Sequence, residues 1–326
     1  MSDQKIKHLV LSGGGLLGIS YIGLFKYFEE HNTLSNIKSI TGCSAGAIFG
    51  TLLAIGYTYK ELDIVVKSMV FKDYLKINVD SLLNFVHTKG LESGHKLHLF
   101  IKNCIKDKTG DENITFNQLQ EKYNIKLQIG VTNLTKSIFE LFNVDTTPDI
   151  SIIKAISASI AIPFIFEPII IGDDIYCDGG ILDNLPIQDL ENPERKYKEN
   201  TNDADKINNS INKENNDDKD TIDNTQDDSL STIGFYLINK SNIINKDNYK
   251  TISISQYVNV MTHTLSRNLI YKKNKIENNN KKNYKIITIE IPCDIMTFIK
   301  LNATHDDINN IIDIAYSIVK LSFTKT

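Results

Sequence analysis

Apolar residues are grouped along the chain in two ways: short uninterrupted runs, and longer stretches in which apolar positions recur every three or four residues. The short runs predict buried strands, and the longer stretches predict helices with one face toward a core. The predicted strands are residues 8–12, 39–41, 127–133, 139–143, 169–177 (a strand or hairpin), 233–238 and 284–291. The predicted helices are residues 17–30, 45–57, 59–69, 95–106, 150–161, 254–271 and 306–321. Because strands alternate with helices, we expect an α/β fold with a mostly parallel sheet and helices on both faces.

One segment, residues 191–232, interrupts this pattern. It contains 6 Lys and Arg against 12 Asp and Glu residues, a net charge of −6, and almost no large apolar side chains. Such a composition cannot bury enough apolar surface to offset the entropy lost on ordering. We therefore expect a disordered, acidic insertion in a single domain, whose core is residues 1–190 and whose C-terminal part is residues 233–326. A second, basic run at residues 271–284 is also typical of a loop.

The composition excludes several classes of protein. The 326 residues are 41% hydrophobic, enough for one large α/β domain to fold alone. The net charge is −4, and removing the insertion's −6 leaves +2, so nucleic-acid binding is not indicated. The four cysteines are far apart and form no C-x-x-C pair, which indicates neither a metal site nor a disulfide framework. No apolar stretch is long enough for a signal peptide or a membrane span, so we expect an intracellular, cytoplasmic protein.

A glycine-rich loop joins the first predicted strand to the first predicted helix. Gly13, Gly15 and Gly18 fit the spacing G-x-G-x-x-G of dinucleotide-binding proteins, but the second strand then lacks the acidic residue that holds a ribose. A P-loop is excluded because no Gly-Lys-Ser/Thr follows. Two interpretations remain. Gly13, Gly14 and Gly15 form either a plain tight turn or a set of N–H groups that binds a phosphate or the oxyanion of an attacked ester.

Ser44 lies between two glycines in the stretch TGCSAG, at a strand end and directly before a helix of small residues. A nucleophile elbow needs small residues two positions before and after its serine, because the turn is strained and crowded. Gly42 and Gly46 meet this requirement. Ser44 is therefore a candidate nucleophile, against the alternative of a small residue at an ordinary strand–helix junction.

An activated serine needs a base. Asp178 ends a predicted strand and is followed by Gly179 and Gly180, so no neighbouring side chain crowds its carboxylate. Asp183 is a weaker candidate, because LDNLP is typical of a turn. His263 and His305 would allow a Ser–Asp–His order. Both histidines, however, occur in helical patterns rather than at strand ends beside glycines.

These pieces, in this order, resemble the patatin-like phospholipase family. The similar stretches are the oxyanion loop Gly13–Gly18, the elbow Gly42–Gly46, the A-S-x-A-x-P-x-x-F stretch Ala158–Phe166, the D-G-G motif Asp178–Gly180 and the N-x-P ending Asn184–Pro186. The resemblance covers residues 7–190 and resumes more weakly over residues 232–323. One departure is Leu16, because many members of the family carry Arg or Lys directly after the three glycines, although others carry an apolar residue.

The resemblance implies a three-layer α/β/α fold and a Ser–Asp dyad without histidine. Ser44 would then be the nucleophile and Asp178 the base, with Gly13, Gly14 and Gly15 forming an oxyanion hole and no metal or other cofactor needed. The implied activity is phospholipase A-type hydrolysis of phospholipid or other lipid esters, with transient binding to a membrane surface, aided by the basic residues Lys272–Lys285. The alternatives are a catalytically silent lipid-binding or interaction protein on the same fold, and a nucleotide-binding α/β protein. The sequence indicates no oligomeric state.

Overall fold

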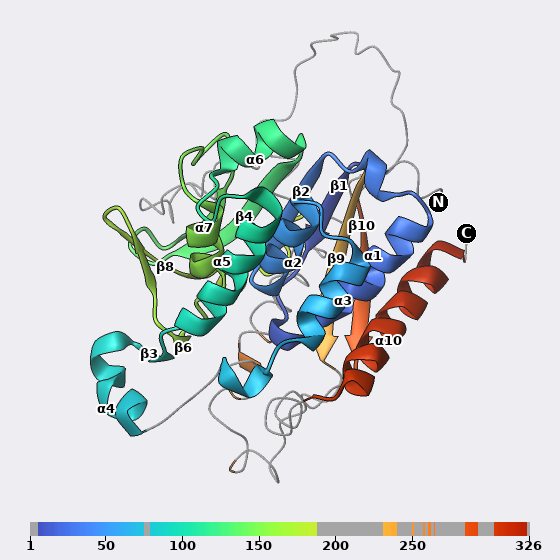
Figure 1. Ribbon diagram of the computed structural model, residues 1–326. Helices are drawn as coiled ribbons and strands as arrows, with labels where there is room; N and C mark the ends of the chain where they lie inside the picture. Colours follow the sequence, from blue (N-terminus) through green and yellow to red (C-terminus); the bar gives the residue numbers. More distant parts are fainter. Residues whose placement is uncertain are drawn as a thin grey trace, which may run out of the picture.

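The computed structural model describes residues 6–74, 79–187, 231–239, 284–292 and 303–324, together with a few single positions between 250 and 264. A central sheet crosses the molecule with the strand order β10-β9-β1-β2-β4-β8-β7, and β5 also pairs with β4 (Figure 1). These strands are β1 (His8–Leu11), β2 (Ser39–Cys43), β4 (Lys126–Asn133), β5 (Ile138–Phe142), β7 (Ile169–Ile171), β8 (Asp174–Asp178), β9 (Thr232–Asn239) and β10 (Tyr284–Ile291). The run from β10 to β4 is parallel, whereas β5, β7 and β8 pair antiparallel.

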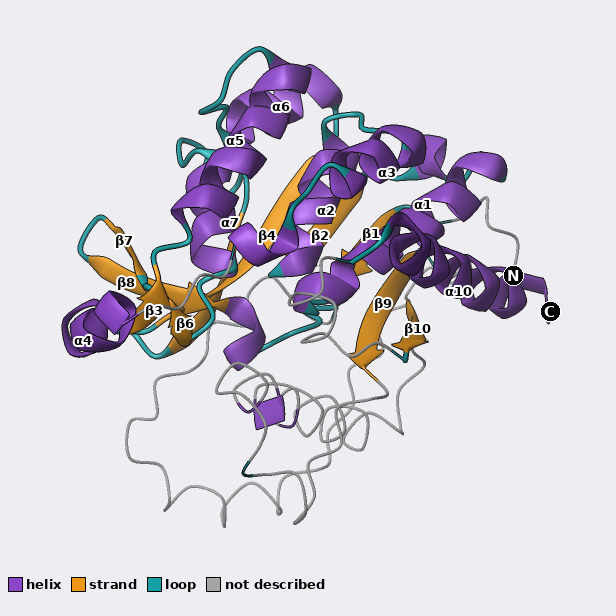
Figure 2. Cartoon of the chain, turned by 60° about the horizontal axis from the view of Figure 1, so that its bottom comes forward, coloured by secondary structure: helices purple, strands orange, loops and turns teal. Residues whose placement is uncertain are grey.

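Helices pack along one face of this sheet (Figure 2). They are α1 (Tyr21–Glu30), α2 (Ala45–Ala54), α3 (Tyr59–Lys67), α5 (His95–Thr109), α6 (Phe116–Tyr123), α7 (Ile152–Ser159) and α10 (His305–Thr324). A further helix, α4 (Val79–Thr88), lies at the periphery beside a small parallel pair, β3 (Gly90–Glu92) and β6 (Phe164–Phe166). The predicted α/β fold, with a mostly parallel central sheet flanked by helices, is confirmed; that helices cover both faces stays a prediction, because the helices described above lie on one face.

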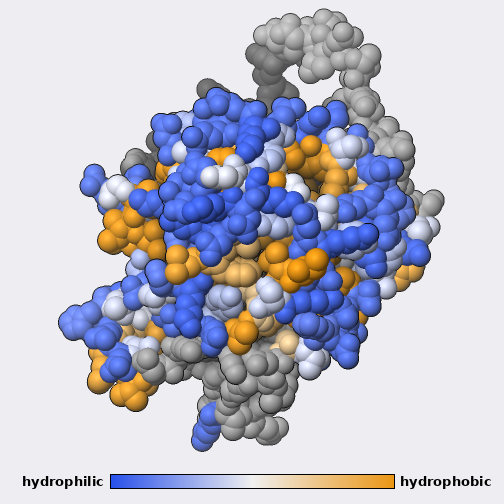
Figure 3. Space-filling model, in the orientation of Figure 1, coloured by the Kyte–Doolittle hydropathy of each residue, from blue (hydrophilic) through white to orange (hydrophobic). Residues whose placement is uncertain are grey.

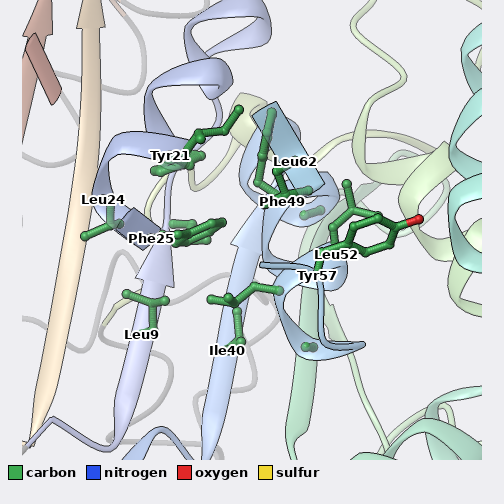
Figure 4. Close-up of a cluster of buried hydrophobic side chains, with 14 of the residues drawn as sticks. Leu9, Tyr21, Leu24, Phe25, Ile40, Phe49, Leu52, Tyr57 and Leu62 are labelled. Atoms are coloured by element: carbon green, nitrogen blue, oxygen red, sulfur yellow. The ribbon is translucent and has the colours of Figure 1, made fainter. Parts of the chain in front are cut away.

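The main core fills the space between the sheet and these helices (Figure 4). Alternate residues of each strand enter it, so that Leu9 and Leu11 of β1 face the helices while Val10 faces the other side. Figure 4 shows strand residues meeting aromatic and aliphatic side chains of the helices: Leu9, Tyr21, Leu24, Phe25, Ile40, Phe49, Leu52, Tyr57 and Leu62. The opposite face carries a smaller buried cluster: Val10, Leu185, Ile187, Tyr236 and Tyr284.

Local signals explain where several helices begin and end. Thr58 and Glu61 form a capping box at the start of α3, and Thr115 and Gln118 form another at the start of α6. Gly110, in the left-handed conformation, ends α5. These caps satisfy N–H and C=O groups that a helix end leaves without partners.

The predicted elements agree with the structure along most of the described chain. The predicted helix at 17–30 begins as the 3-10 helix η2 (Gly15–Ser20) before α1, and the predicted strand or hairpin at 169–177 is the β7–β8 hairpin. The sequence pattern predicts no element at α4, α6, β3 or β6. The insertion predicted at 191–232 lies outside the described residues, except for its last two residues, 231 and 232. The strand β9 begins at Thr232. Most of the helix predicted at 254–271 also lies outside them.

Candidate active site

Ser44 occupies a strained turn between β2 and α2. Its backbone has φ 51° and ψ −119°, a conformation that residues other than glycine rarely adopt. The turn is also crowded, because a Cβ atom on Gly42 would lie 2.3 Å from the Gly46 carbonyl oxygen, and one on Gly46 would lie 2.2 Å from the Leu11 carbonyl oxygen. Only glycine fits at these two positions. The turn therefore has the geometry of a nucleophile elbow, with Ser44 directly before the N-terminus of α2.

The sheet register brings Asp178 to this turn. β4 pairs with β5 along one edge over Ile129–Asn133, so β2 and β8 share its other edge. On that shared edge, Cys43 pairs with Gly130 and Asp178 pairs with the next residue, Val131. The ends of β2 and β8 therefore meet, which brings the Ser44 hydroxyl close enough to the Asp178 carboxylate to lower its pKa.

Asp178 is buried, and burial raises its pKa from 3.8 to about 6, while hydrogen bonds from the Ser44 hydroxyl and the Gly180 N–H oppose the shift. The Gly180 N–H donates to Oδ1 at 2.7 Å. The backbone is also held, because the Asp178 N–H donates to the Ala161 carbonyl at 2.9 Å. A fixed carboxylate with a pKa near neutrality, next to a hydroxyl, can accept that hydroxyl's proton.

The other candidate bases lie elsewhere. Asp183 is buried and accepts a hydrogen bond from the Leu185 N–H at 3.2 Å, which closes the turn that the sequence predicts. His305 is an exposed residue at the start of α10, whereas Ser44 is buried. His263 lies outside the described residues.

The glycine loop lies directly over Ser44. A Cβ atom on Gly13 would come within 2.9 Å of the Ser44 Cβ. The Gly13 N–H, however, donates to the side chain and backbone oxygens of Asn184, at 3.1 and 3.3 Å, and the Asn184 amide donates back to the Gly13 carbonyl at 3.3 Å. Gly14 is half-buried, Gly15 is exposed with φ +55°, and among the described residues no acceptor meets either N–H. Among the described residues, the amides of Gly14 and Gly15 are therefore left without an acceptor, whereas that of Gly13 is occupied.

The remaining motif glycines have packing roles. A Cβ atom on Gly18 would lie 2.9 Å from the Ala45 Cβ and from a Phe49 ring carbon, so Gly18 lets η2 pack closely on α2. A Cβ atom on Gly179 would lie 2.4 Å from the Gly130 carbonyl oxygen. Gly179 thus allows the 3-10 helix η5 (Gly179–Ile181), which includes Gly180, to begin against β4.

Two residues that support the site were assigned no role from the sequence. Ser159, at the end of α7, is fully buried, accepts a hydrogen bond from the Ser44 N–H at 2.9 Å and donates to the Gly130 carbonyl at 2.7 Å. Asn184 holds the glycine loop as described above. Both occur in stretches that carry the family resemblance, and that resemblance is the signal that could have identified them.

The thiols beside the site do not compete with Ser44 as nucleophiles. Cys43 and Cys177 are buried and unpaired, and burial raises the pKa of both thiols, that of Cys177 to about 12. Both are therefore neutral near pH 7. In the part of the chain that the structure describes, no group of His, Cys, Asp or Glu side chains is arranged to hold a metal ion. No helix among these residues is both long and apolar enough to cross a bilayer.

Comparison with known proteins gives consistent results. A family model described as patatin-like phospholipase matches residues 9–191. The chain is 36% identical over 188 residues to an uncharacterized protein of Acanthamoeba polyphaga mimivirus, covering 57% of this chain and 62% of that protein. It is 32% identical over 189 residues to a probable lipid hydrolase of Invertebrate iridescent virus 6, covering 57% of this chain and 64% of that protein. It is 30% identical over 191 residues to lysophospholipase NTE1 of Eremothecium gossypii, covering 59% of this chain and 11% of that protein. The chain thus spans less than two thirds of the length of each of these relatives.

Proposed function

This chain belongs to the patatin-like phospholipase family, and we propose that it is a lipid acyl hydrolase of phospholipase A type that uses Ser44 as nucleophile and Asp178 as its base. The observation that carries this proposal is that the sheet register places a serine on a strained elbow next to a buried carboxylate whose pKa is raised to about 6. The similarity to a probable lipid hydrolase and to a lysophospholipase supports a lipid ester as the substrate.

The proposed reaction has two steps. The Ser44 Oγ attacks the acyl carbonyl carbon while Asp178 accepts the hydroxyl proton, and the carbonyl electron pair moves to oxygen. The N–H groups of Gly14 and Gly15 stabilise this oxyanion. The intermediate collapses to an acyl-serine, and the leaving alcohol takes the proton from Asp178. Water then attacks the acyl-serine with Asp178 again as base, which releases the fatty acid and restores Ser44.

The elbow and the dyad contribute to this reaction in different ways. The strained turn holds the Ser44 hydroxyl in one orientation, and Ser159 fixes its N–H, so little motion is needed before attack. Burial keeps Asp178 basic enough to take a proton near neutral pH. Neither role requires a histidine or a metal ion.

The test is turnover of a short p-nitrophenyl ester by four proteins: wild type, Ser44→Ala, Asp178→Asn and the double variant. We expect each single variant to lose nearly all activity and the double variant to be little worse, because the two residues act as one unit. His305→Ala, an exposed residue, is the matched control and should keep its activity. A folded wild-type protein that turns over neither this ester nor a phospholipid would favour a silent lipid-binding protein instead.

A further inference from the structure

Helix α4 turns its apolar face to solvent. Val79, Leu82, Leu83 and Val86 recur at the spacing i, i+3, i+4, i+7 and are 70%, 55%, 72% and 68% exposed. A surface helix normally directs such a stripe to the core. Every other helix whose bounds the structure defines exposes at most one large apolar side chain. In the space-filling view, apolar colour gathers at the lower left, over α4 (Figure 3).

The outward orientation of this stripe is set by contacts on the other side of the helix. The Phe85 ring packs against the Phe164 ring of β6, with centroids 6.2 Å apart. The Thr88 hydroxyl donates to the Gly90 carbonyl at 2.8 Å, where β3 begins. Phe164 is itself 52% exposed, so β6 adds an exposed apolar side chain next to the helix. We call Val79, Leu82, Leu83, Val86 and Phe164 the α4 surface.

The charges around the α4 surface fit a lipid interface. The helix carries a single acidic residue, Asp80, in its first turn, and the exposed cation Lys89 directly follows its last turn; further along the chain come Glu92 in β3 and the exposed Lys96 in α5. A group of exposed apolar side chains of this kind marks a docking surface. Apolar side chains that enter the boundary between headgroups and acyl chains, with lysines at anionic headgroups, are typical of interfacial helices.

The α4 surface is also connected to the proposed active site. Phe164 lies three residues after Ala161, whose carbonyl accepts the Asp178 N–H. Three residues span at most about 11 Å of extended chain. The segment that holds the proposed base therefore runs into β6, the strand that carries the ring against which α4 packs.

We propose that the α4 surface docks this protein onto a lipid bilayer and presents the bilayer's ester groups to Ser44. This inference rests on the proposed function for its substrate, but the docking itself is measurable without catalysis. The basic run expected to meet headgroups, Lys272–Lys285, lies outside the described residues except for its last two residues, and the Lys285 Nζ donates to the Ser322 carbonyl of α10 at 2.9 Å.

The test compares the full-length wild type with a variant that carries Leu82→Ser, Leu83→Ser and Val86→Ser. Vesicles of phosphatidylcholine and phosphatidylserine are used in flotation assays, and the same proteins are assayed on vesicle lipid and on a soluble p-nitrophenyl ester. We expect binding to fall on the order of a hundredfold, because three large apolar side chains no longer enter the lipid. Hydrolysis of vesicle lipid should fall with it, whereas soluble-ester turnover and the melting temperature should not change, since the three side chains are exposed.

Leu321→Ser is the matched control, because Leu321 is 55% exposed on α10, on the opposite side of the molecule from α4 (Figures 1 and 2). It should bind vesicles like wild type. If the triple variant folds poorly, Leu83→Glu alone makes the same test.

Two results would overturn the proposal. The first is that the α4 variants bind vesicles as well as wild type does. The second is that light scattering shows a wild-type dimer that these variants convert to a monomer, because the α4 surface would then be a self-association face. Binding that depends on α4 without any ester turnover would instead refute the proposed function and leave the docking intact.

Discussion

Replacing the proposed base should make the protein more stable while it removes activity. Asp178 is buried, and its pKa is raised from 3.8 to about 6, so its ionised form is disfavoured in the folded state. Asparagine has nearly the same shape, and its side chain can still accept the Gly180 N–H and donate to the Ser44 hydroxyl. Asp178→Asn therefore removes a buried charge with little loss of hydrogen bonding.

The expected magnitude follows from the two pKa values. A raised folded-state pKa means that the native state binds more protons than the unfolded state between pH 3.8 and about 6, so ionisation lowers the free energy of unfolding as pH rises through that window. With a difference of about two pKa units, ionisation of Asp178 lowers the free energy of unfolding by about 3 kcal/mol at pH 8. At pH 4, where the carboxyl is mostly protonated in the folded state, the loss is less than about 1 kcal/mol. The gain from Asp178→Asn should therefore grow with pH and level off above about pH 6.

Urea denaturation of wild type and Asp178→Asn between pH 4 and pH 8 measures the gain in the free energy of unfolding. The matched control is Asp174→Asn, at the other end of β8, because a hydrogen bond from Lys136 holds the pKa of Asp174 below its usual value. Its folded-state pKa is lowered, so this variant should lose stability near neutral pH and lose less as pH falls. A gain for Asp178→Asn that is absent at pH 8, or is the same at pH 4 and pH 8, would refute this account of the carboxylate.

Three further predictions concern the site. Soluble-ester kcat/KM should fall as pH drops below about 6, where Asp178 takes up a proton, and a profile flat to pH 4.5 would exclude it as the base. Ser159→Ala should lower activity at least about tenfold and cost about 1–3 kcal/mol, because the Ser44 N–H and the Gly130 carbonyl both lose a buried partner. Ser157→Ala, on the same helix but bonded to His98, is its control and should keep the activity. Gly46→Ala should abolish soluble expression or cost more than about 3 kcal/mol, since its Cβ would overlap the Leu11 carbonyl; a melting temperature like that of wild type would contradict the elbow geometry.

The elements that the sequence predicts correctly are those with local signals. β10 has the predicted bounds, and α1, α2, α3, α5, α7 and α10 follow helical periodicity. Ser44 and Asp178 could also be selected locally as candidates, because each lies at a strand end with glycines within two residues.

The supporting residues could not be assigned in this way, because their roles depend on contacts between distant parts of the chain. Ser159 is 115 residues from Ser44, and Asn184 is 171 residues from Gly13. The same contact with Asn184 occupies the Gly13 N–H, which no local pattern indicates. For α4, the apolar spacing is present in the sequence, but packing alone determines that this face points to solvent.

The most direct measurement of the central claim is covalent labelling with a fluorophosphonate, followed by mass spectrometry of the digested protein. An activated serine displaces fluoride from phosphorus, so the account predicts one phosphonylated peptide, with the label on Ser44. Asp178→Asn should label far more slowly, while His305→Ala labels like wild type. Label on another serine, or unchanged labelling of Ser44 in Asp178→Asn, would contradict the Ser44–Asp178 dyad.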